Sequence, residues 1–339
     1  MRLVHLLLGV LLLLAACQPT APTTNTPVPT GTATVATLEP TPTAAPWPTR
    51  FFPIPEGIAV TRSDDRGVIV IPEAELTLEL PGANPWDISQ HQPAGASEHF
   101  RFHSLDGTTP IPLAELQAEA DVIYDEVAAR VGAAIGGRIP VTFLPPQEGT
   151  CPVRGVASFG GPDRAGEMQI LIFADEATSP QQVLGVLAHE TAHLLHARTT
   201  NGMGRSVALQ EGFAHWAASR AVNAWYGSAS FDDLIRVYLE EGRYRPLSEV
   251  YEFYEEPPGF DDPADCLAWR DQLYTQWAAF IGFLVDTYGR PRLDQLMGSP
   301  TSEPADDGYT VQPADFQGVY GLALNQLEAQ WLSQLTGGD

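Results

Sequence analysis

The sequence predicts an α+β protein: a small mixed or antiparallel sheet packed on one buried helix, followed by a mostly helical C-terminal half. Three observations support this. Short β-rich segments at 139–144, 156–159 and 168–173 are bounded by glycine or proline. An apolar stretch at 183–196 contains no proline and is long enough for a helix. Beyond that stretch, the remaining apolar segments have helical rather than strand patterns.

Residues 1–17 have the pattern of an export signal, with Arg2, a short apolar run and small residues before Cys17. The run is too short to remain as a membrane-spanning helix. Its end, Leu-Ala-Ala-Cys, resembles a bacterial lipobox, which implies cleavage before Cys17 and lipidation of that cysteine. The exported protein would then be held by lipid on the outer face of the cytoplasmic membrane or cell surface. An ordinary secretory signal with a chance cysteine is the alternative.

Two segments separate this signal from the main domain. Residues 18–50 are almost wholly proline, threonine, alanine and valine, so they cannot bury a core and should form an extended tether, reaching on the order of 100 Å when stretched. Residues 51–97 contain two strand-like runs, at 67–71 and 75–80. We expect a small β-rich leader there, whose function the sequence does not reveal.

The main domain is expected at 98–337. Its first strand is at 99–103, where His99 and His103 alternate with phenylalanines and so should lie on the polar face. An apolar stripe predicts a helix from Leu113 to about Ile135, ended by two glycines. A strand at 139–144 and a hairpin of 156–159 with 168–173 precede the buried helix. Further helices are expected at about 207–218, 229–242, 263–287 and 315–335.

The composition narrows the range of functions. The formal net charge is −24, and all 18 basic residues are arginine. The absence of lysine excludes a P-loop, a Schiff-base enzyme and a Ser-Lys catalyst. The acidic balance argues against binding to nucleic acid or anionic lipid surfaces. It fits an exported soluble domain, which we expect to be a monomer.

The chain has three cysteines. If Cys17 carries lipid, Cys151 and Cys266 remain in an oxidising compartment and are candidates for a disulfide. That bond would join the loop after strand 139–144 to the start of helix 263–287. Neither cysteine lies in a C-x-x-C motif, which argues against a structural zinc site. Two free buried thiols are the alternative.

The buried helix contains titratable side chains, and their burial needs an explanation. His189 and His193 are four positions apart, so they share a helix face and can direct two imidazoles at one point. That is the geometry in which a zinc ion takes two ligands from one helix. Glu190 is rotated from them by about 100°, where a carboxylate can reach a metal-activated water without binding the metal. Solvated residues on a surface helix are the alternative, but the apolar flanks demand burial, and buried histidines need partners.

Glu211 is the candidate third ligand, from the next apolar helix, eighteen positions after His193. A helix, a turn and an antiparallel return could bring it to the metal. Two histidines and one glutamate would hold one Zn²⁺ ion with a fourth position left for water, the pattern of a catalytic site.

The combination of H-E-x-x-H at 189–193 with E-G-x-A at 211–214 resembles the gluzincin metallopeptidases, in particular peptidase MA-like domains. The resemblance implies a zincin-like fold, zinc on His189, His193 and Glu211, and a peptide or protein substrate. It also implies that residues 155–160 or 168–173 form the edge on which the substrate backbone lies; ordinary core strands are the alternative.

Two further positions follow from the resemblance. Tyr274 lies sixty-three positions after Glu211 and opens a helix comparable to the one whose tyrosine stabilises the tetrahedral intermediate in related peptidases. A plain buried tyrosine is the competing interpretation. His215 stands where gluzincins often carry an acid that orients a ligand histidine. It could still accept a hydrogen bond from an imidazole, or that role could belong to another residue.

The expected reaction is peptide hydrolysis in which Glu190 acts as general base on a water that the zinc activates. Two alternatives stay open. The domain could be a degenerate relative that binds zinc or peptide without cutting, or a zinc amidase that acts on cell-wall material.

Overall fold

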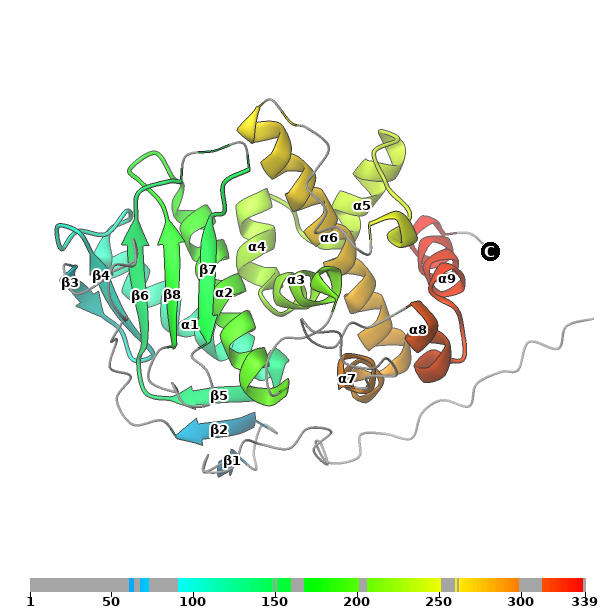
Figure 1. Ribbon diagram of the computed structural model, residues 1–339, viewed down its shortest axis with the longest axis horizontal. Coiled ribbons are helices and arrows are strands. Elements are labelled where there is room, and N and C mark those ends of the chain that lie inside the picture. The colour runs from blue at the N-terminus through cyan, green and yellow to red at the C-terminus, as the bar shows by residue number, and fades with distance from the viewer. Residues whose placement is uncertain are drawn as a thin grey trace, which may run out of the picture. The chain divides into compact units, whose positions relative to one another are not determined.

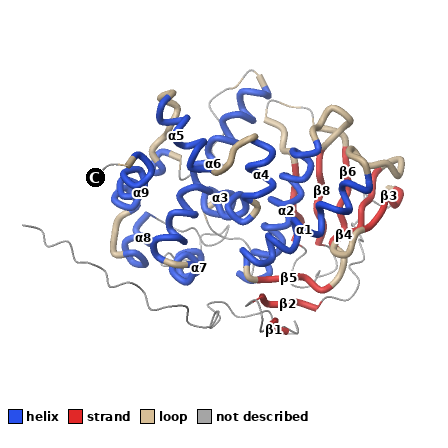
Figure 2. Tube along the Cα trace, turned by 180° about the vertical axis from the view of Figure 1, so that it is seen from behind, coloured by secondary structure: helices blue, strands red, loops and turns tan. Residues whose placement is uncertain are grey.

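The computed structural model describes residues 61–63, 68–72, 91–147, 149, 151–159, 168–200, 206–250, 260, 262–298 and 313–337. The expected signal, tether, Cys17 and strand 75–80 lie outside these residues. Within them the α+β class is confirmed: a sheet formed by the first half of the described chain is followed by a mostly helical second half (Figures 1 and 2).

The main sheet has five strands in the order β3-β4-β6-β8-β7. β4, β6 and β8 run parallel to one another, and β3 and β7 pair antiparallel at the two edges. The strands are β3 (Gln92–Ala96), β4 (Phe100–Ser104), β6 (Ile139–Leu144), β7 (Gly155–Phe159) and β8 (Met168–Phe173). β3, which falls in the expected leader segment, therefore belongs by its pairing to the same sheet as β4.

The burial pattern explains which strands lie inside the sheet. Every residue of β6 and of β8 is buried, as expected for central parallel strands covered on both faces. β4 alternates instead, with Phe100 and Phe102 fully buried between less buried neighbours. The hairpin of β7 and β8 puts β7 at the free edge, next to the helix α2 (Pro180–Thr200).

The first helix is shorter than its apolar stripe predicts. α1 spans Leu113–Val131, and Gly132 ends it with φ 80°, a left-handed conformation suited to glycine. β5 (Ala133–Gly136) follows at once and pairs parallel to β2 (Val68–Pro72), which pairs with β1 (Thr61–Ser63). The predicted continuation of the helix to Ile135 is therefore wrong, because those residues form the third strand of a second small sheet.

The second half of the chain is helical, with more breaks than predicted. The segment expected as one helix at 315–335 is two helices, separated at Gly321, which has φ 73°. Two short helices, α4 and α7, were not predicted. The elements are α3 (Val207–Ala217), α4 (Ser219–Tyr226), α5 (Phe231–Glu240), a 3₁₀ turn (Leu247–Glu249), α6 (Pro263–Tyr288), α7 (Arg290–Gly298), α8 (Pro313–Tyr320) and α9 (Leu324–Thr336).

The long helix α6 organises this half by packing against α3. Trp277 of α6 is fully buried, and a Cβ placed on Gly212 of α3 would lie 2.5 Å from the Cβ of Trp277. Only glycine at position 212 allows the two helices to approach so closely. Because Glu211 immediately precedes this contact, the packing of α3 on α6 also fixes the position of Glu211.

A disulfide joins Cys151 to Cys266 with a Cα–Cα distance of 5.4 Å, so the predicted pairing is confirmed. It connects the segment before β7 to the first turn of α6. None of the helices in the described part of the chain is long and apolar enough to cross a membrane.

Candidate active site

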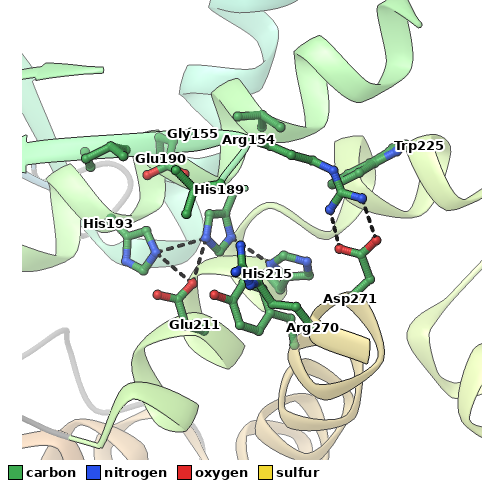
Figure 3. A pocket seen from close by; sticks show the side chains of 15 residues that line it. Arg154, Gly155, His189, Glu190, His193, Glu211, His215, Trp225, Arg270 and Asp271 are labelled. Atoms are coloured by element: carbon green, nitrogen blue, oxygen red, sulfur yellow. Dashed lines mark hydrogen bonds and ion pairs between the residues drawn. The ribbon is translucent and has the colours of Figure 1, made fainter. Parts of the chain in front are cut away.

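Two consecutive helices bring His189, His193 and Glu211 together (Figure 3). The two imidazoles extend from one face of α2, with their Nε2 atoms 2.9 Å apart. The Oε2 atom of Glu211, from α3, lies 3.0 Å from Nε2 of His189 and 3.3 Å from Nε2 of His193. Both histidines are buried, so the three potential donor atoms converge in a place with little solvent.

The donor set fits a zinc ion. A tetrahedral zinc with bonds of about 2.0–2.2 Å to nitrogen and oxygen needs ligand atoms about 3.3–3.6 Å apart. The three distances in the cluster, 2.9, 3.0 and 3.3 Å, lie at or slightly below that range. Among the described residues, this is the group of histidine, cysteine and acidic side chains that could hold a metal ion.

The charges in the cluster favour a cation. Burial opposes the ionisation of Glu211, but the imidazoles of His193 and His189 hold the pKa of its carboxyl well below the usual range. Burial also opposes protonation of His193, but the neighbouring Glu211 carboxylate raises the pKa of that imidazole. The carboxylate thus attracts a positive charge to the place where the two ring nitrogens meet, and a divalent cation satisfies all three groups at once.

Glu190 extends from α2 toward the edge strand β7. Burial raises the pKa of its carboxyl, although the backbone N–H of Ala157 donates a hydrogen bond to it. A Cβ on Gly155 would lie 2.6 Å from Oε1 of Glu190, so a side chain at position 155 would displace this carboxylate. Glu190 is therefore held beside the cluster, and its carboxylate is not among the groups whose atoms converge there, as expected for a base that does not bind the metal.

The sheet edge next to the cluster is β7. β8 pairs on both sides, with β6 and with β7, so its backbone is already engaged. Of the two segments expected as the substrate edge, only 155–159 has an open side among the described strands. Its residues Gly155, Val156 and Ala157 line a pocket of about 280 Å³ together with the His189, His193, Glu190 and Glu211 side chains.

His215 is in contact with a ligand candidate. Its Nδ1 lies 2.7 Å from Nδ1 of His189, and its Nε2 lies 3.0 Å from the hydroxyl of Tyr226. Burial holds the pKa of His215 well below its usual range, so the ring is neutral and carries one proton. When Nε2 of His189 faces a metal, its Nδ1–H donates to His215, whose Nε2–H then donates to Tyr226.

The hydrogen-bond chain ends on a carboxylate. Tyr226 donates to Asp271, and Asp271 accepts a bidentate pair from Arg154, with Nη–Oδ distances of 2.5 and 3.0 Å. The Arg154 guanidinium also lies 4.8 Å over the ring of Trp225. His189 is therefore connected to the carboxylate of Asp271 on α6 through two intermediate side chains, His215 on α3 and Tyr226 on α4.

Tyr274 also lies at this site. Its ring is stacked on His189 with centroids 5.9 Å apart, makes an edge contact with His215 at 5.1 Å, and lines the pocket. The proximity is compatible with the expected oxyanion role and does not test it. His196, by contrast, stacks on Phe213 at 4.1 Å and packs in the core.

Three charged residues of the pocket, Arg154, Arg270 and Asp271, were not identified from the sequence. The predicted disulfide could have indicated these residues. The predicted disulfide already placed the segment after Cys151 beside the first turns of the helix that begins near Cys266. Charged residues within five positions of either cysteine were therefore candidates to meet.

No family model matches the chain, and no curated protein matches it. Among solved structures, it is similar to an M1 zinc metallopeptidase mutant from Deinococcus radiodurans, with a TM-score of 0.36 and 17% identity over 71% of this chain. The chain covers 50% of that protein and thus spans half of its length. At this identity and TM-score the likeness does not establish a function, which has to be argued from the site itself.

Proposed function

We propose that this protein is a zinc-dependent peptidase of the gluzincin type. The observation that carries the proposal is the convergence of His189, His193 and Glu211, with donor atoms 2.9–3.3 Å apart beside an open sheet edge. His189, His193 and Glu211 would hold the ion. A zinc ion bound by two imidazoles and one carboxylate supplies Lewis acidity, which activates water and polarises a carbonyl group.

The chain's own residues would complete the reaction. The carboxyl of Glu190, whose pKa is raised by burial, is suited to take a proton from water and pass it to the leaving amine. The open edge of β7 offers backbone groups to an extended peptide. Tyr274, stacked on His189, is the candidate donor to the oxyanion. We further propose that the peptidase is exported and attached to the membrane through lipid on Cys17.

The test is the substitution Glu190→Gln in the purified protein. Glutamine has the size of glutamate but cannot accept the proton, so peptide hydrolysis should fall by at least ~10³-fold while bound zinc stays near one ion per chain. Hydrolysis of a peptide library, followed by mass spectrometry, and zinc content by elemental analysis measure the two quantities. His193→Ala is the matched variant, which should lose both zinc and activity.

Two results would count against the proposal. If Glu190→Gln hydrolyses peptides as fast as the wild type, Glu190 is not the base. If the wild type binds zinc but cleaves no peptide in the library, the protein is a zinc-binding relative without peptidase activity.

A further inference from the structure

The pocket beside the cluster of His189, His193 and Glu211 is lined by two arginine side chains, Arg154 and Arg270. Its charged lining residues outside the cluster are Glu190, Arg154, Asp271 and Arg270. Arg154 and Asp271 neutralise each other in a bidentate pair, with both side chains about one-fifth exposed. Burial raises the pKa of the Asp271 carboxyl and Arg270 opposes this shift from a distance, but Arg270 makes no ion pair with Asp271 or with any other described residue.

Arg270 is held in place by main-chain oxygens. Its Nη1 donates to the carbonyl of Pro152 at 3.0 Å. Its Nη2 donates to the carbonyl of Cys151 at 3.2 Å and to Sγ of the same residue at 2.8 Å. The disulfide to Cys266, one helical turn before Arg270 on α6, fixes the segment that carries these carbonyls. A guanidinium has five N–H donors, and three of them make these bonds. The Nε–H and one N–H of Nη1 are left for a ligand.

The position of Arg270 relates it to the reaction centre. Arg270 and Tyr274 are four residues apart on α6 and so share a helix face, about 6 Å apart along the axis. Tyr274 stacks on His189. Arg154 directly precedes the edge strand at Gly155 (Figure 3). An extended peptide advances about 3.3 Å per residue, so Arg270 lies roughly one or two residues from a bond placed at the cluster.

We propose that Arg270, with the Arg154–Asp271 pair beside it, forms a carboxylate-binding subsite of the pocket. This inference rests on the proposed peptidase function and adds a substrate class to it: peptides with a carboxylate one or two residues from the scissile bond. A carboxylate is a charged acceptor, which forms strong hydrogen bonds with the guanidinium N–H groups that remain on Arg270. The carboxylate can be the C-terminus of the peptide or an aspartate or glutamate side chain.

The experiment uses one peptide that the wild type cleaves, in paired versions that differ by one carboxylate. One pair has a free or an amidated C-terminus two residues after the scissile bond. The other pairs, all amidated, have aspartate or asparagine one or two residues from the bond on either side. The first pair tests the C-terminal carboxylate, and the others test an acidic side chain.

Each version is measured as kcat/KM with the zinc-loaded wild type, Arg270→Gln, Arg270→Lys and the control Arg138→Gln. Arg138 is exposed between β5 and β6, so Arg138→Gln removes the same charge at a position outside the lining of the pocket. For Arg270→Gln we expect a 10- to 100-fold loss on the carboxylate versions and a change within about threefold on the neutral versions. Arg270→Lys should retain part of the preference, since it keeps the charge without the oriented guanidinium N–H groups, and Arg138→Gln should match the wild type.

A purely structural role for Arg270 would lower kcat/KM equally on neutral and carboxylate versions, and that result would overturn the subsite. A wild type without any carboxylate preference would overturn it as well. Thermal melting of each variant shows whether the fold is retained, and Arg270→Lys decides the question if Arg270→Gln does not fold.

Binding separates this proposal from the proposed activity. The same peptides, labelled with a fluorophore, are titrated onto zinc-loaded Glu190→Gln with and without Arg270→Gln. Carboxylate-dependent binding in a protein whose wild type cleaves nothing would support the subsite and refute the peptidase. Cleavage without carboxylate dependence would support the peptidase and refute the subsite. If no peptide is bound or cleaved, both proposals are refuted.

Discussion

At the scale of single residues, His215 contacts the ring of His189 from the position where an acid was expected. The resemblance to gluzincins predicts an acid four positions after Glu211, able to hold the ring of a ligand histidine. An imidazole occupies that position, 2.7 Å from Nδ1 of His189. A neutral imidazole can accept from His189 only if its other nitrogen carries the proton, and the Tyr226 hydroxyl at 3.0 Å accepts a hydrogen bond from that N–H. The carboxylate of this hydrogen-bond chain therefore belongs to Asp271, which is separated from His189 by two side chains.

This arrangement predicts that His215 positions His189 for metal binding. Replacing His215 with alanine should weaken zinc affinity about 10- to 100-fold, because His189 loses the partner that fixes its tautomer and ring orientation. Tyr226→Phe keeps the ring and removes one hydroxyl, so its loss should be smaller and in the same direction. Competition with a fluorescent zinc chelator measures both.

The outcome that would contradict this role is an unchanged zinc affinity in a folded His215→Ala protein. His215→Asn is the matched variant, since its amide oxygen can accept from an imidazole N–H. We expect it to recover part of the lost affinity, which a merely destabilised core would not show.

At the scale of elements, the close approach of α3 and α6 holds Glu211 in place. A Cβ at position 212 would lie 2.5 Å from the Cβ and 2.8 Å from the backbone carbon of Trp277, so neither helix can relieve the overlap by a rotamer change. We predict that Gly212→Ala lowers the free energy of unfolding by about 1–3 kcal/mol. It should also weaken zinc binding by shifting Glu211.

Gly318 of α8 is the matched control, because a Cβ placed there meets nothing within 4 Å. Gly318→Ala should leave stability unchanged or raise it by up to ~1 kcal/mol, as alanine favours a helix interior over glycine. Urea unfolding followed by circular dichroism measures both variants. Equal stability of the two alanine variants would show that α3 and α6 can separate at little cost.

Elements that are determined by neighbouring residues were predicted correctly, whereas those that depend on a distant partner were not. Helix α2 and the spacing of His189 and His193 follow from neighbouring residues, and both are as expected. The end of α1 was misplaced because the apolar residues at 133–135 fit a helix stripe as well as a strand. Their strand partner β2 is more than sixty positions earlier in the chain.

The same distinction applies to the site. The sequence named the converging residues through motif spacing and the disulfide through its two remaining cysteines. It could not name Asp271, because the contacts of this carboxylate join residues from α4, α6 and the segment before β7. Those meet only once helices and sheet are packed, and no periodicity within one segment records that meeting.

At the scale of the whole molecule, the proposed attachment through lipid on Cys17 can be compared with attachment through charge. No described helix is long and apolar enough to cross a bilayer. The net charge of −24 repels anionic lipid surfaces, so electrostatic adsorption is unfavourable. Two or more acyl chains on one residue, in contrast, give stable anchoring that does not depend on charge. Cys17 is the residue whose sequence context favours such a modification.

We therefore predict that the protein expressed in bacteria sediments with membranes, is released by detergent and is not released by high salt. A metabolically supplied palmitate analogue should label the wild type and not Cys17→Ser, since serine offers no thiol for the lipid. Mass spectrometry of the mature N-terminus should find Cys17 as the first residue, with the added mass of its acyl groups. A wild type that is unlabelled and cleaved elsewhere would indicate an ordinary secretory signal, and release by salt alone would indicate attachment through charge.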